Sequence, residues 1–287
     1  MVMRRVGTCV PRHFTHLPSH NSPLSLSLSL FLSGDFTRTK DIETCSLQHT
    51  LCCCCLLLSH IALFFISYSV QGALLFITSG AAESYSKDFN ILVAPCVSPW
   101  GYEHIQRWTP LAVDPNRSFK RDKPDECGSQ EARAVVQLLQ SCGVSKWCCH
   151  IDLHETTDTD ELEFRVAKAA RDGDTSEPGT IPDGYYLCGD AMNAQLEFQR
   201  AIIAGVREVT HIAPADPDGT LIGSKAVDEG IILYDYKVLG LCGGVTNATY
   251  STTTEVYPDS EHVTEEECNR AQVKSVTSAL DYILAQK

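Results

Sequence analysis

The chain has 287 residues, which is enough for one large domain or two small ones. It carries 23 Lys and Arg against 36 Asp and Glu, a formal net charge of −13. An acidic surface repels nucleic acid and anionic lipid, so neither is an expected partner.

The N-terminal part has an unusual composition. Residues 24–30 read LSLSLSL, which is what a CT dinucleotide repeat encodes in frame, and residues 52–55 read CCCC. Such alternation could also form a strand, but the flanking residues give no turn signals. We therefore treat residues 1–71 as a low-complexity, apolar segment that resembles translated non-coding sequence.

A membrane anchor is the alternative for this segment. No Asp, Glu, Lys or Arg occurs between Thr44 and Ala82, and residues 51–70 are long enough to span a bilayer. No basic cluster flanks this stretch to set its orientation, so membrane association is not expected. The eight cysteines after residue 84 contain no CxxC pair. They are expected to be buried thiols in a reducing compartment, which favours a cytoplasmic protein.

Residues 72–287 have the pattern of an α/β domain. Continuous apolar runs predict strands that are buried on both faces. These runs are residues 73–80 (ALLFITSG), 89–96 (FNILVAPC), 146–154 (KWCCHIDLH), 230–236 (GIILYDY) and 249–257 (TYSTTTEVY).

Helices are predicted between and after these runs. Residues 129–142 have apolar side chains at helical spacing and are followed by Gly143. Asp190 can cap a helix that contains Leu196 to Val206, and Thr264 with Glu267 forms a capping box for the last helix. Strands that alternate with helices predict a mixed, largely parallel sheet covered by helices on both faces.

Polar residues follow several predicted strands. His154 and Glu255 each end a strand, and the segment PCVSPWGYE (95–103) follows another. Ligands bind at the carboxyl ends of strands in such sheets, so these features predict a site at one edge. The acidic residues Asp158, Asp160, Glu161 and Glu163 are expected to form a solvated loop.

Four motifs in this order resemble the zinc carboxypeptidase family, in its carboxypeptidase A-like form. They are PCVSPWGYEHIQRW (95–108), DPNRSF (114–119), IDLHETTD (151–158) and TTTEVYPD (252–259). The resemblance covers about residues 73–287. It implies a zinc carboxypeptidase-like fold, zinc as the cofactor, and a substrate that carries a free carboxylate.

The resemblance also implies roles for individual residues. His154 corresponds to the last zinc ligand, and Glu255 to the general base. Asn116 and Arg117 correspond to the pair that binds the substrate's terminal carboxylate, a task that suits a guanidinium fork. Two further roles are implied, with Arg107 stabilising the oxyanion and Tyr236 or Tyr234 covering the substrate.

Other interpretations of these residues remain open. His154 alone could be a core histidine that is bonded to a neighbour. Arg117 could form a surface ion pair with Asp114 or Asp122, and Glu255 could end an edge strand.

One part of the family pattern is missing. A His-x-x-Glu pair should follow the early strand, but Gly80 is followed by AAESYSKDFN. If residues 73–80 and 89–96 are parallel neighbours, the link between them is also too short for a crossover. Both defects predict a deletion after Gly80 and an incomplete fold. With His154 as the one matched ligand, this chain is not expected to hold zinc.

The sequence therefore predicts a metallocarboxypeptidase-like hydrolase whose complete form cleaves a C-terminal peptide bond. The motif DLHETT (152–157) also resembles the aspartoacylase and succinylglutamate desuccinylase branch, which cleaves N-acyl amino acids. A third possibility is a zinc-free pseudoenzyme that binds carboxylates.

Overall fold

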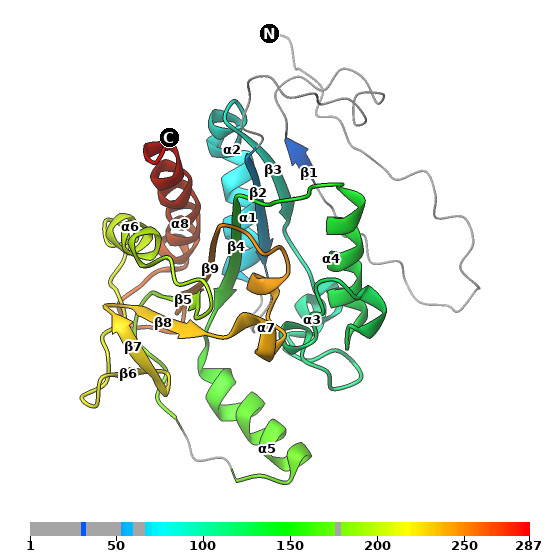
Figure 1. Ribbon diagram of the computed structural model, residues 1–287. Helices are drawn as coiled ribbons and strands as arrows, with labels where there is room; N and C mark the ends of the chain where they lie inside the picture. The colour runs from blue at the N-terminus through cyan, green and yellow to red at the C-terminus, as the bar shows by residue number, and fades with distance from the viewer. Residues whose placement is uncertain (1–29, 33–52, 60–66, 176–178) are drawn as a thin grey trace.

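The fold is built on one open, mixed sheet with helices on both faces (Figure 1). The computed structural model describes residues 30–32, 53–59, 67–175 and 179–287. Its sheet has nine strands in the order β1-β3-β2-β4-β9-β5-β8-β7-β6. The strands are β1 (Leu30–Leu32), β2 (Cys53–Ser59), β3 (Phe89–Ala94), β4 (Cys149–Glu155), β5 (Tyr186–Asp190), β6 (Thr220–Leu221), β7 (Ser224–Asp228), β8 (Ile231–Tyr234) and β9 (Tyr250–Val256).

The strands change direction near the middle of the sheet. β3, β2, β4 and β9 are parallel neighbours, whereas β5 runs antiparallel to β9 and parallel to β8. The carboxyl ends of β4 and β9 therefore meet the start of β5. Glu255 on β9 pairs with His154 on one side and with Tyr186 on the other.

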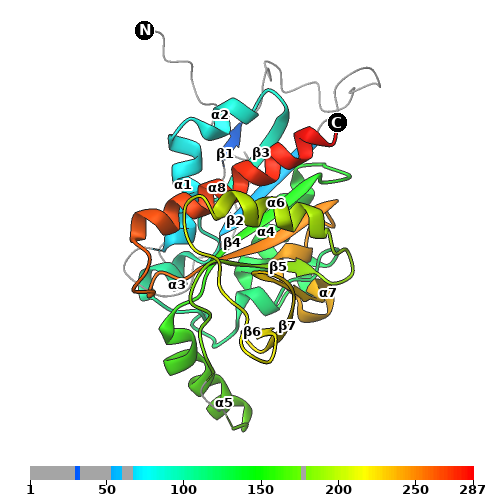
Figure 2. The same cartoon turned by 90° about the vertical axis from the view of Figure 1, so that its left-hand side faces the viewer.

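Helices cover the two faces of the sheet unevenly (Figures 1 and 2). The α-helices are α1 (Tyr68–Thr78), α2 (Ala81–Tyr85), α3 (Pro99–His104), α4 (Gln130–Ser141), α5 (Val166–Asp172), α6 (Leu196–Val206), α7 (Tyr236–Leu239) and α8 (Glu265–Ala285). Short 3-10 or π turns are η1 (Pro115–Arg117), η2 (Pro124–Glu126), η3 (Asp160–Arg165) and η4 (Cys242–Gly244). One face carries α1, α6 and α8, and the other carries α4.

The hydrophobic core is divided by the sheet. Ile91 and Val93 of β3 lie in the cluster under α1 and α8, whereas Leu92 and Ala94 lie in the cluster under α4. Successive side chains of a strand point to opposite faces, so an uninterrupted apolar run fills both clusters. The fold class predicted from sequence is confirmed, with four parallel and four antiparallel strand pairs in the described part of the chain.

The predicted strand at residues 73–80 is wrong. This run forms most of helix α1, whose N-cap is Ser67 and whose buried side chains include Ala73 and Phe76. A short apolar run does not by itself distinguish a buried strand from a buried helix. The deciding feature is Ser67, whose hydroxyl accepts a hydrogen bond from the backbone N–H of Val70.

The helix α1 belongs to the crossover that was predicted to be missing. β2 pairs in parallel with both β3 and β4, and α1 with α2 supplies the helical connection from β2 to β3. The short link after Gly80 is therefore no longer a reason to predict a deletion there. The domain boundary that was predicted between residues 71 and 72 falls inside α1. Seven residues of the alternative membrane span, Cys53–Ser59, form strand β2 within the sheet.

Two helices follow their sequence signals closely. Ser129 caps α4 by accepting from the Ala132 N–H, and Gly143 follows with φ of +64°. The capping box of α8 is present between Thr264 and Glu267. Helix α6 differs from its prediction, because it begins at Leu196 after Gln195, while Asp190 ends β5.

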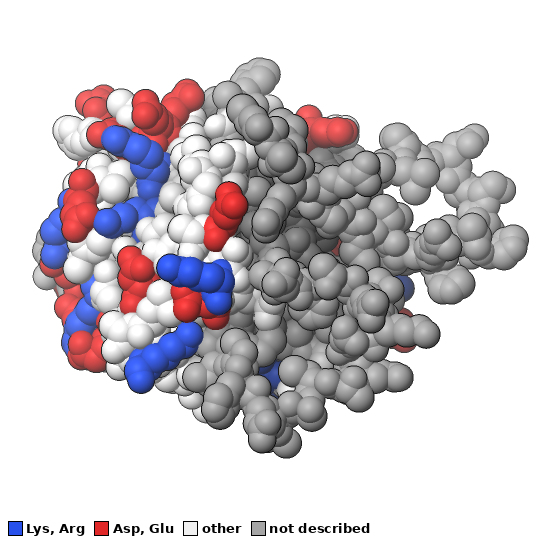
Figure 3. All heavy atoms as spheres, turned by 90° about the horizontal axis from the view of Figure 1, so that it is seen from above, with Lys and Arg blue, Asp and Glu red and all other residues white. Residues whose placement is uncertain are grey.

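The surface of the described part carries charges of both signs. On the face seen from above, Lys and Arg are interspersed with Asp and Glu (Figure 3). Among the helices whose placement the structure describes, none combines the length and apolar character that crossing a bilayer requires.

Candidate functional site

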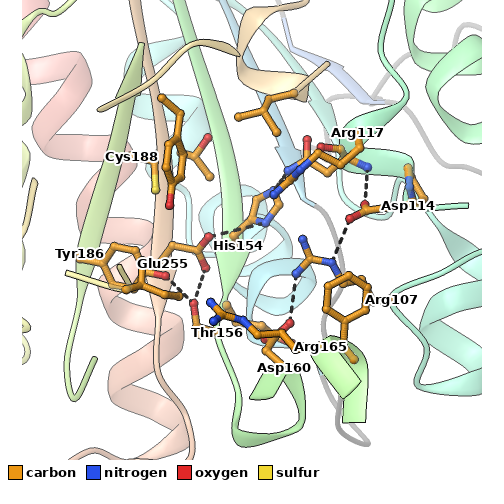
Figure 4. Close-up of a pocket in the computed structure, with 18 of the residues that line it drawn as sticks. Arg107, Asp114, Arg117, His154, Thr156, Asp160, Arg165, Tyr186, Cys188 and Glu255 are labelled. Atoms are coloured by element: carbon orange, nitrogen blue, oxygen red, sulfur yellow. Dashed lines mark hydrogen bonds and ion pairs between the residues drawn. The ribbon is translucent and has the colours of Figure 1, made fainter. Parts of the chain in front are cut away.

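A pocket opens where the carboxyl ends of β4 and β9 meet the start of β5 (Figure 4). Its cavity volume is about 190 Å³. Five of the six residues predicted for the site line it, together with Tyr234, which was the alternative to Tyr236, and with further residues. The lining includes Arg107, Asn116, Arg117, His154 and Glu255, and also Asp114, Glu155, Thr156, Asp160, Phe164, Arg165, Tyr186, Cys188, Tyr234 and Thr253.

His154 is held by partners on both sides of its ring. Nε2 lies 2.9 Å from Oδ2 of the buried Asp152 and 3.2 Å from the amide nitrogen of Asn116. Nδ1 lies 3.8 Å from Oε1 of Glu255. Burial lowers the pKa of His154, but Asp152 and Glu255 more than offset this, so the pKa lies above its usual value.

The turn η1 presents Asn116 and Arg117 to the pocket. Asp114 shapes this turn, because its Oδ1 accepts from the backbone N–H of Asn116 at 2.8 Å. The side-chain oxygen of Asn116 accepts from the Cys242 N–H at 2.8 Å, which directs the amide nitrogen toward His154. The two residues are adjacent in the DPNRSF motif, and the hydrogen bonds of Asp114 and Cys242 orient them in the turn.

Arg117 lines the pocket and is partly exposed to solvent. Its Nη1 donates to the carbonyl oxygen of Asn116 at 2.7 Å. Within the described ranges, no carboxylate lies within ion-pair distance of its guanidinium. Desolvation by the surrounding protein atoms, and then the neighbouring Arg107, lower the pKa of Arg117 from its usual value. A guanidinium without a paired carboxylate can bind an incoming anion.

Arg107 is fixed by two carboxylates and one ring. Its Nε donates to Asp114 at 3.1 Å, and its Nη1 donates to Asp160 at 3.0 Å. The guanidinium carbon lies 4.4 Å from the centre of the Phe164 ring. Burial lowers the pKa of Arg107, but the two aspartates raise it above its usual value, so the guanidinium is charged.

Glu255 lies between His154 and the hydroxyl of Thr156. Oε2 accepts from Thr156 at 3.0 Å, and Thr156 is in turn 2.8 Å from the hydroxyl of Tyr186. Burial raises the pKa of Glu255 to about 7, although His154 and Thr156 act in the opposite direction. A carboxyl group with a pKa near neutrality can both take up and release a proton at physiological pH.

A second buried carboxyl group, Glu155, lies beside the site. Its Oε2 accepts from the backbone N–H groups of Tyr68 (2.7 Å) and Ser69 (3.2 Å), at the start of α1. Burial raises the pKa of Glu155 well above its usual value, against the effect of these two bonds. Glu155 therefore ties α1 to the end of β4.

The placement of Tyr236 differs from its prediction. The side chain is 1% exposed, and its hydroxyl contacts the carbonyl oxygen of Cys188 and the hydroxyl of Thr253. Tyr236 is therefore a core residue rather than a cover for the substrate. The alternative that the sequence left open, Tyr234, does line the pocket.

Acidic residues near the site were partly misjudged. Asp160 and Glu161, expected in a solvated loop, are 7% and 8% exposed. Asp160 binds Arg107 and also accepts from the Thr157 N–H at 3.0 Å. The sequence signal that could have identified Asp160 is its distance of six residues from His154, within the same strand-end turn.

The described residues do not fit a zinc site on their own. In the part of the chain that the structure describes, no three His, Cys, Asp or Glu side chains are grouped so that they could hold a metal ion. The early strand that the resemblance requires is β2, and residues 60–66, which follow it, lie outside the described ranges. Their sequence, HIALFFI, contains His60 but no acidic residue.

The sheet order and the pocket at the carboxyl ends of its strands define a class of protein, the metallocarboxypeptidase fold. No family model matches the sequence, and no curated protein matches it. The fold is assigned from the similarity to solved structures, and at sequence identities between 11% and 17% this similarity shows the fold alone.

Three solved structures illustrate the similarity. A proposed metallopeptidase from Shewanella amazonensis SB2B is 17% identical, with a TM-score of 0.56 over 80% of this chain and 77% of that chain. A metallo-carboxypeptidase from Burkholderia cenocepacia is 14% identical, with a TM-score of 0.56 over 90% of this chain and 61% of that chain. Bovine thrombin-activatable fibrinolysis inhibitor is 11% identical, with a TM-score of 0.51 over 81% and 83%.

The pKa of Glu255 predicts a pH-dependent effect on stability. Below about pH 4.5 the Glu255 carboxyl group is neutral in both the folded and the unfolded chain. Above that pH the group ionises first in the unfolded chain, so the free energy of unfolding falls as the pH rises toward 7. Glu255→Gln removes this loss. We expect the stability of the variant relative to the parent protein to rise by up to about 3 kcal/mol from pH 5 to pH 8, at 1.36 kcal/mol per pKa unit.

Urea unfolding at the two pH values measures this difference. Glu103→Gln is the matched control, because Glu103 is exposed on α3. A Glu255→Gln effect that is the same at pH 5 and pH 8 would contradict the raised pKa.

Proposed function

We propose that this protein binds peptides or N-acyl amino acids through their free carboxylate, which contacts Arg117 and Asn116. The observation that carries this proposal is the guanidinium of Arg117, which lines the pocket beside Asn116 and has no ion-paired carboxylate within the described ranges. A carboxylate that enters the pocket would form bidentate hydrogen bonds with this guanidinium.

The neighbouring structures support a substrate with a free carboxylate. A metallo-carboxypeptidase from Pseudomonas aeruginosa with a TM-score of 0.50 was solved with a guanidinoethylmercapto-succinic acid, which carries carboxyl groups. For a form with a complete metal site, we propose that the reaction is cleavage of a C-terminal peptide bond. In such a form we assign the general-base role to Glu255 and the stabilisation of the oxyanion to Arg107.

Because the described residues supply one motif-matched metal ligand, His154, we assign carboxylate binding rather than hydrolysis to the chain as it stands. His154, Asn116 and Glu255 then form the floor of a binding pocket. The proposed function is therefore that of a zinc-free pseudoenzyme, in which Asn116 and Arg117 bind the carboxylate.

Calorimetry with paired ligands tests this function. N-acetylphenylalanine and its amide differ only in the carboxylate, so the acid is expected to bind at least about tenfold more tightly, as hydrogen bonds to a charged group contribute roughly 1.5–3 kcal/mol each. The titrations are made in the presence of a chelator. Equal affinity for the acid and the amide would refute the proposal.

The size of the cavity favours a second candidate, an N-acyl amino acid deacylase. A volume of about 190 Å³ is small compared with typical ligand pockets of roughly 300–1,000 Å³. A single acylated amino acid suits such a cavity better than a longer peptide. If the chain is active with added zinc, turnover of N-acylated amino acids but not of blocked dipeptides would favour the deacylase.

A further inference from the structure

Two buried glutamines join helices of one face of the sheet to strand β9. Gln199 of α6 and Gln272 of α8 are each 0% exposed. The hydroxyl of Thr252 donates to Oε1 of Gln199 at 2.7 Å. In the same way, the hydroxyl of Thr254 donates to Oε1 of Gln272 at 2.6 Å. Successive side chains of a strand alternate in direction, so Thr254 points to α8 while its neighbour Glu255 points to the pocket.

The amide nitrogens of the two glutamines bind different strands. Nε2 of Gln199 donates to the carbonyl oxygen of Ser251 at 3.0 Å, so both of its bonds are to β9. Nε2 of Gln272 donates instead to the carbonyl oxygen of His154 at 2.7 Å, near the end of β4. Gln272 therefore bridges β4 and β9 at the point where the paired residues His154 and Glu255 face the pocket.

The crossing of α1 and α8 fixes the place of Gln272. A Cβ atom at Gly72 of α1 would lie 2.4 Å from the Cβ atom of Gln272, so a side chain there would push the two helices apart. Three residues earlier on α8, Nδ2 of Asn269 donates to Oε1 of Gln71 at 3.1 Å. These adjacent contacts set the position of α8 along α1, and with it the reach of the Gln272 amide to β4.

His154 is the residue through which this bridge acts on the pocket. Its Nε2 lies 3.2 Å from the amide nitrogen of Asn116, and its Nδ1 lies 3.8 Å from Oε1 of Glu255. A shift of the backbone at His154 moves the ring relative to both neighbours. Binding sites require their side chains to be held within roughly 0.5 Å of the productive position.

We propose that Gln272 is a positioning residue whose amide fixes the backbone of β4 at His154 and so holds the imidazole beside Asn116. This inference rests on the proposed function where it concerns ligand affinity, because it assumes that the carboxylate binds at Arg117 and Asn116. The effect on the ring of His154 does not depend on a ligand. No sequence motif indicates this role, since Gln272 is 118 residues away from His154.

A pair of matched variants tests the role of Gln272. Gln272→Met keeps the length of the side chain and removes both hydrogen bonds. Gln199→Met is the control, because it removes an equivalent pair of bonds that both go to β9. The two variants are expected to lose a similar amount of thermal stability. Only Gln272→Met should shift the imidazole NMR signals of His154 in the ligand-free protein, signals that are assigned by their loss in His154→Gln.

Ligand affinity is the second measurement. Calorimetry with N-acetylphenylalanine should show a loss of about fivefold in Gln272→Met, the scale of one net hydrogen bond, and no loss in Gln199→Met. If the His154 signals move equally in both variants, or in neither, Gln272 is a structural residue and the proposal is overturned. Shifted signals with unchanged affinity would refute its contribution to binding. If the signals move only in Gln272→Met but the parent protein binds the acid and its amide equally, the positioning of His154 stands and carboxylate binding fails.

A second pair of variants decides the question if Gln272→Met does not fold. Thr254→Val removes one bond of the same bridge and nearly keeps the shape of the side chain, and Thr252→Val is its control. A shift of the His154 signals in Thr254→Val alone would support the proposal. Equal signals in these two variants would overturn it.

Discussion

Replacing Arg117 with alanine is expected to lower the affinity for a free-carboxylate ligand by at least about a hundredfold. The loss combines two charge-assisted hydrogen bonds, each contributing roughly 1.5–3 kcal/mol. Arg117→Lys should recover part of the affinity, because the ammonium keeps the charge but not the planar fork. Calorimetry with N-acetylphenylalanine measures both variants.

The exposed Arg133 on α4 provides the control for this experiment, since Arg133→Ala removes a positive charge from a residue that does not line the pocket. Arg117 also donates to the carbonyl oxygen of Asn116, so thermal unfolding must show that the variant keeps its fold. A folded Arg117→Ala protein with less than about a threefold change in affinity would mean that the carboxylate binds elsewhere.

A chain that begins at Gly72 is expected not to fold. It lacks β2, which joins β3 to β4 through six and five register pairs respectively. It also lacks Ser67 and the first turn of α1, to which Glu155 is hydrogen bonded. Without β2 the sheet is divided, and the free energy lost exceeds the usual 5–15 kcal/mol stability of a domain of this kind.

Circular dichroism and urea unfolding test this expectation, with a chain that begins at residue 30 as the control. The control retains each helix and strand that the structure describes. A cooperative transition in the chain that begins at Gly72, with a midpoint near that of the control, would show that residues 1–71 are dispensable, as their composition suggested.

The sequence predicted the elements whose patterns are local. Strands β4 and β9 are rich in apolar or β-branched residues and end in His154 and Glu255, and α8 carries a complete capping box. The motifs around Asn116, Arg117 and Arg107 also placed these residues at the same edge, and all five line one cavity. Local patterns and short motifs were sufficient for these assignments.

The errors arose where tertiary context decides. Residues 73–80 have the composition of a buried strand, but Ser67 caps them into a helix. The run CCCLLLS was assigned to the low-complexity segment 1–71, although it forms strand β2 inside the sheet. Asp160 looked like a loop residue, because its partner Arg107 is 53 residues away in the sequence. Tyr236 is turned into the core, which no pattern in its own segment indicates.

The order of the strands has a consequence for synthesis on the ribosome. β4 ends at Glu155, but its partner β9 begins at Tyr250, about 95 residues later. At roughly 5–20 residues per second, translation of this interval takes about 5–20 s. During this time β4 has a neighbour on its β2 side and an open edge on the other, and an open edge can pair with another chain. The nascent chain is therefore most in need of a chaperone between the completion of β4 and the arrival of β9.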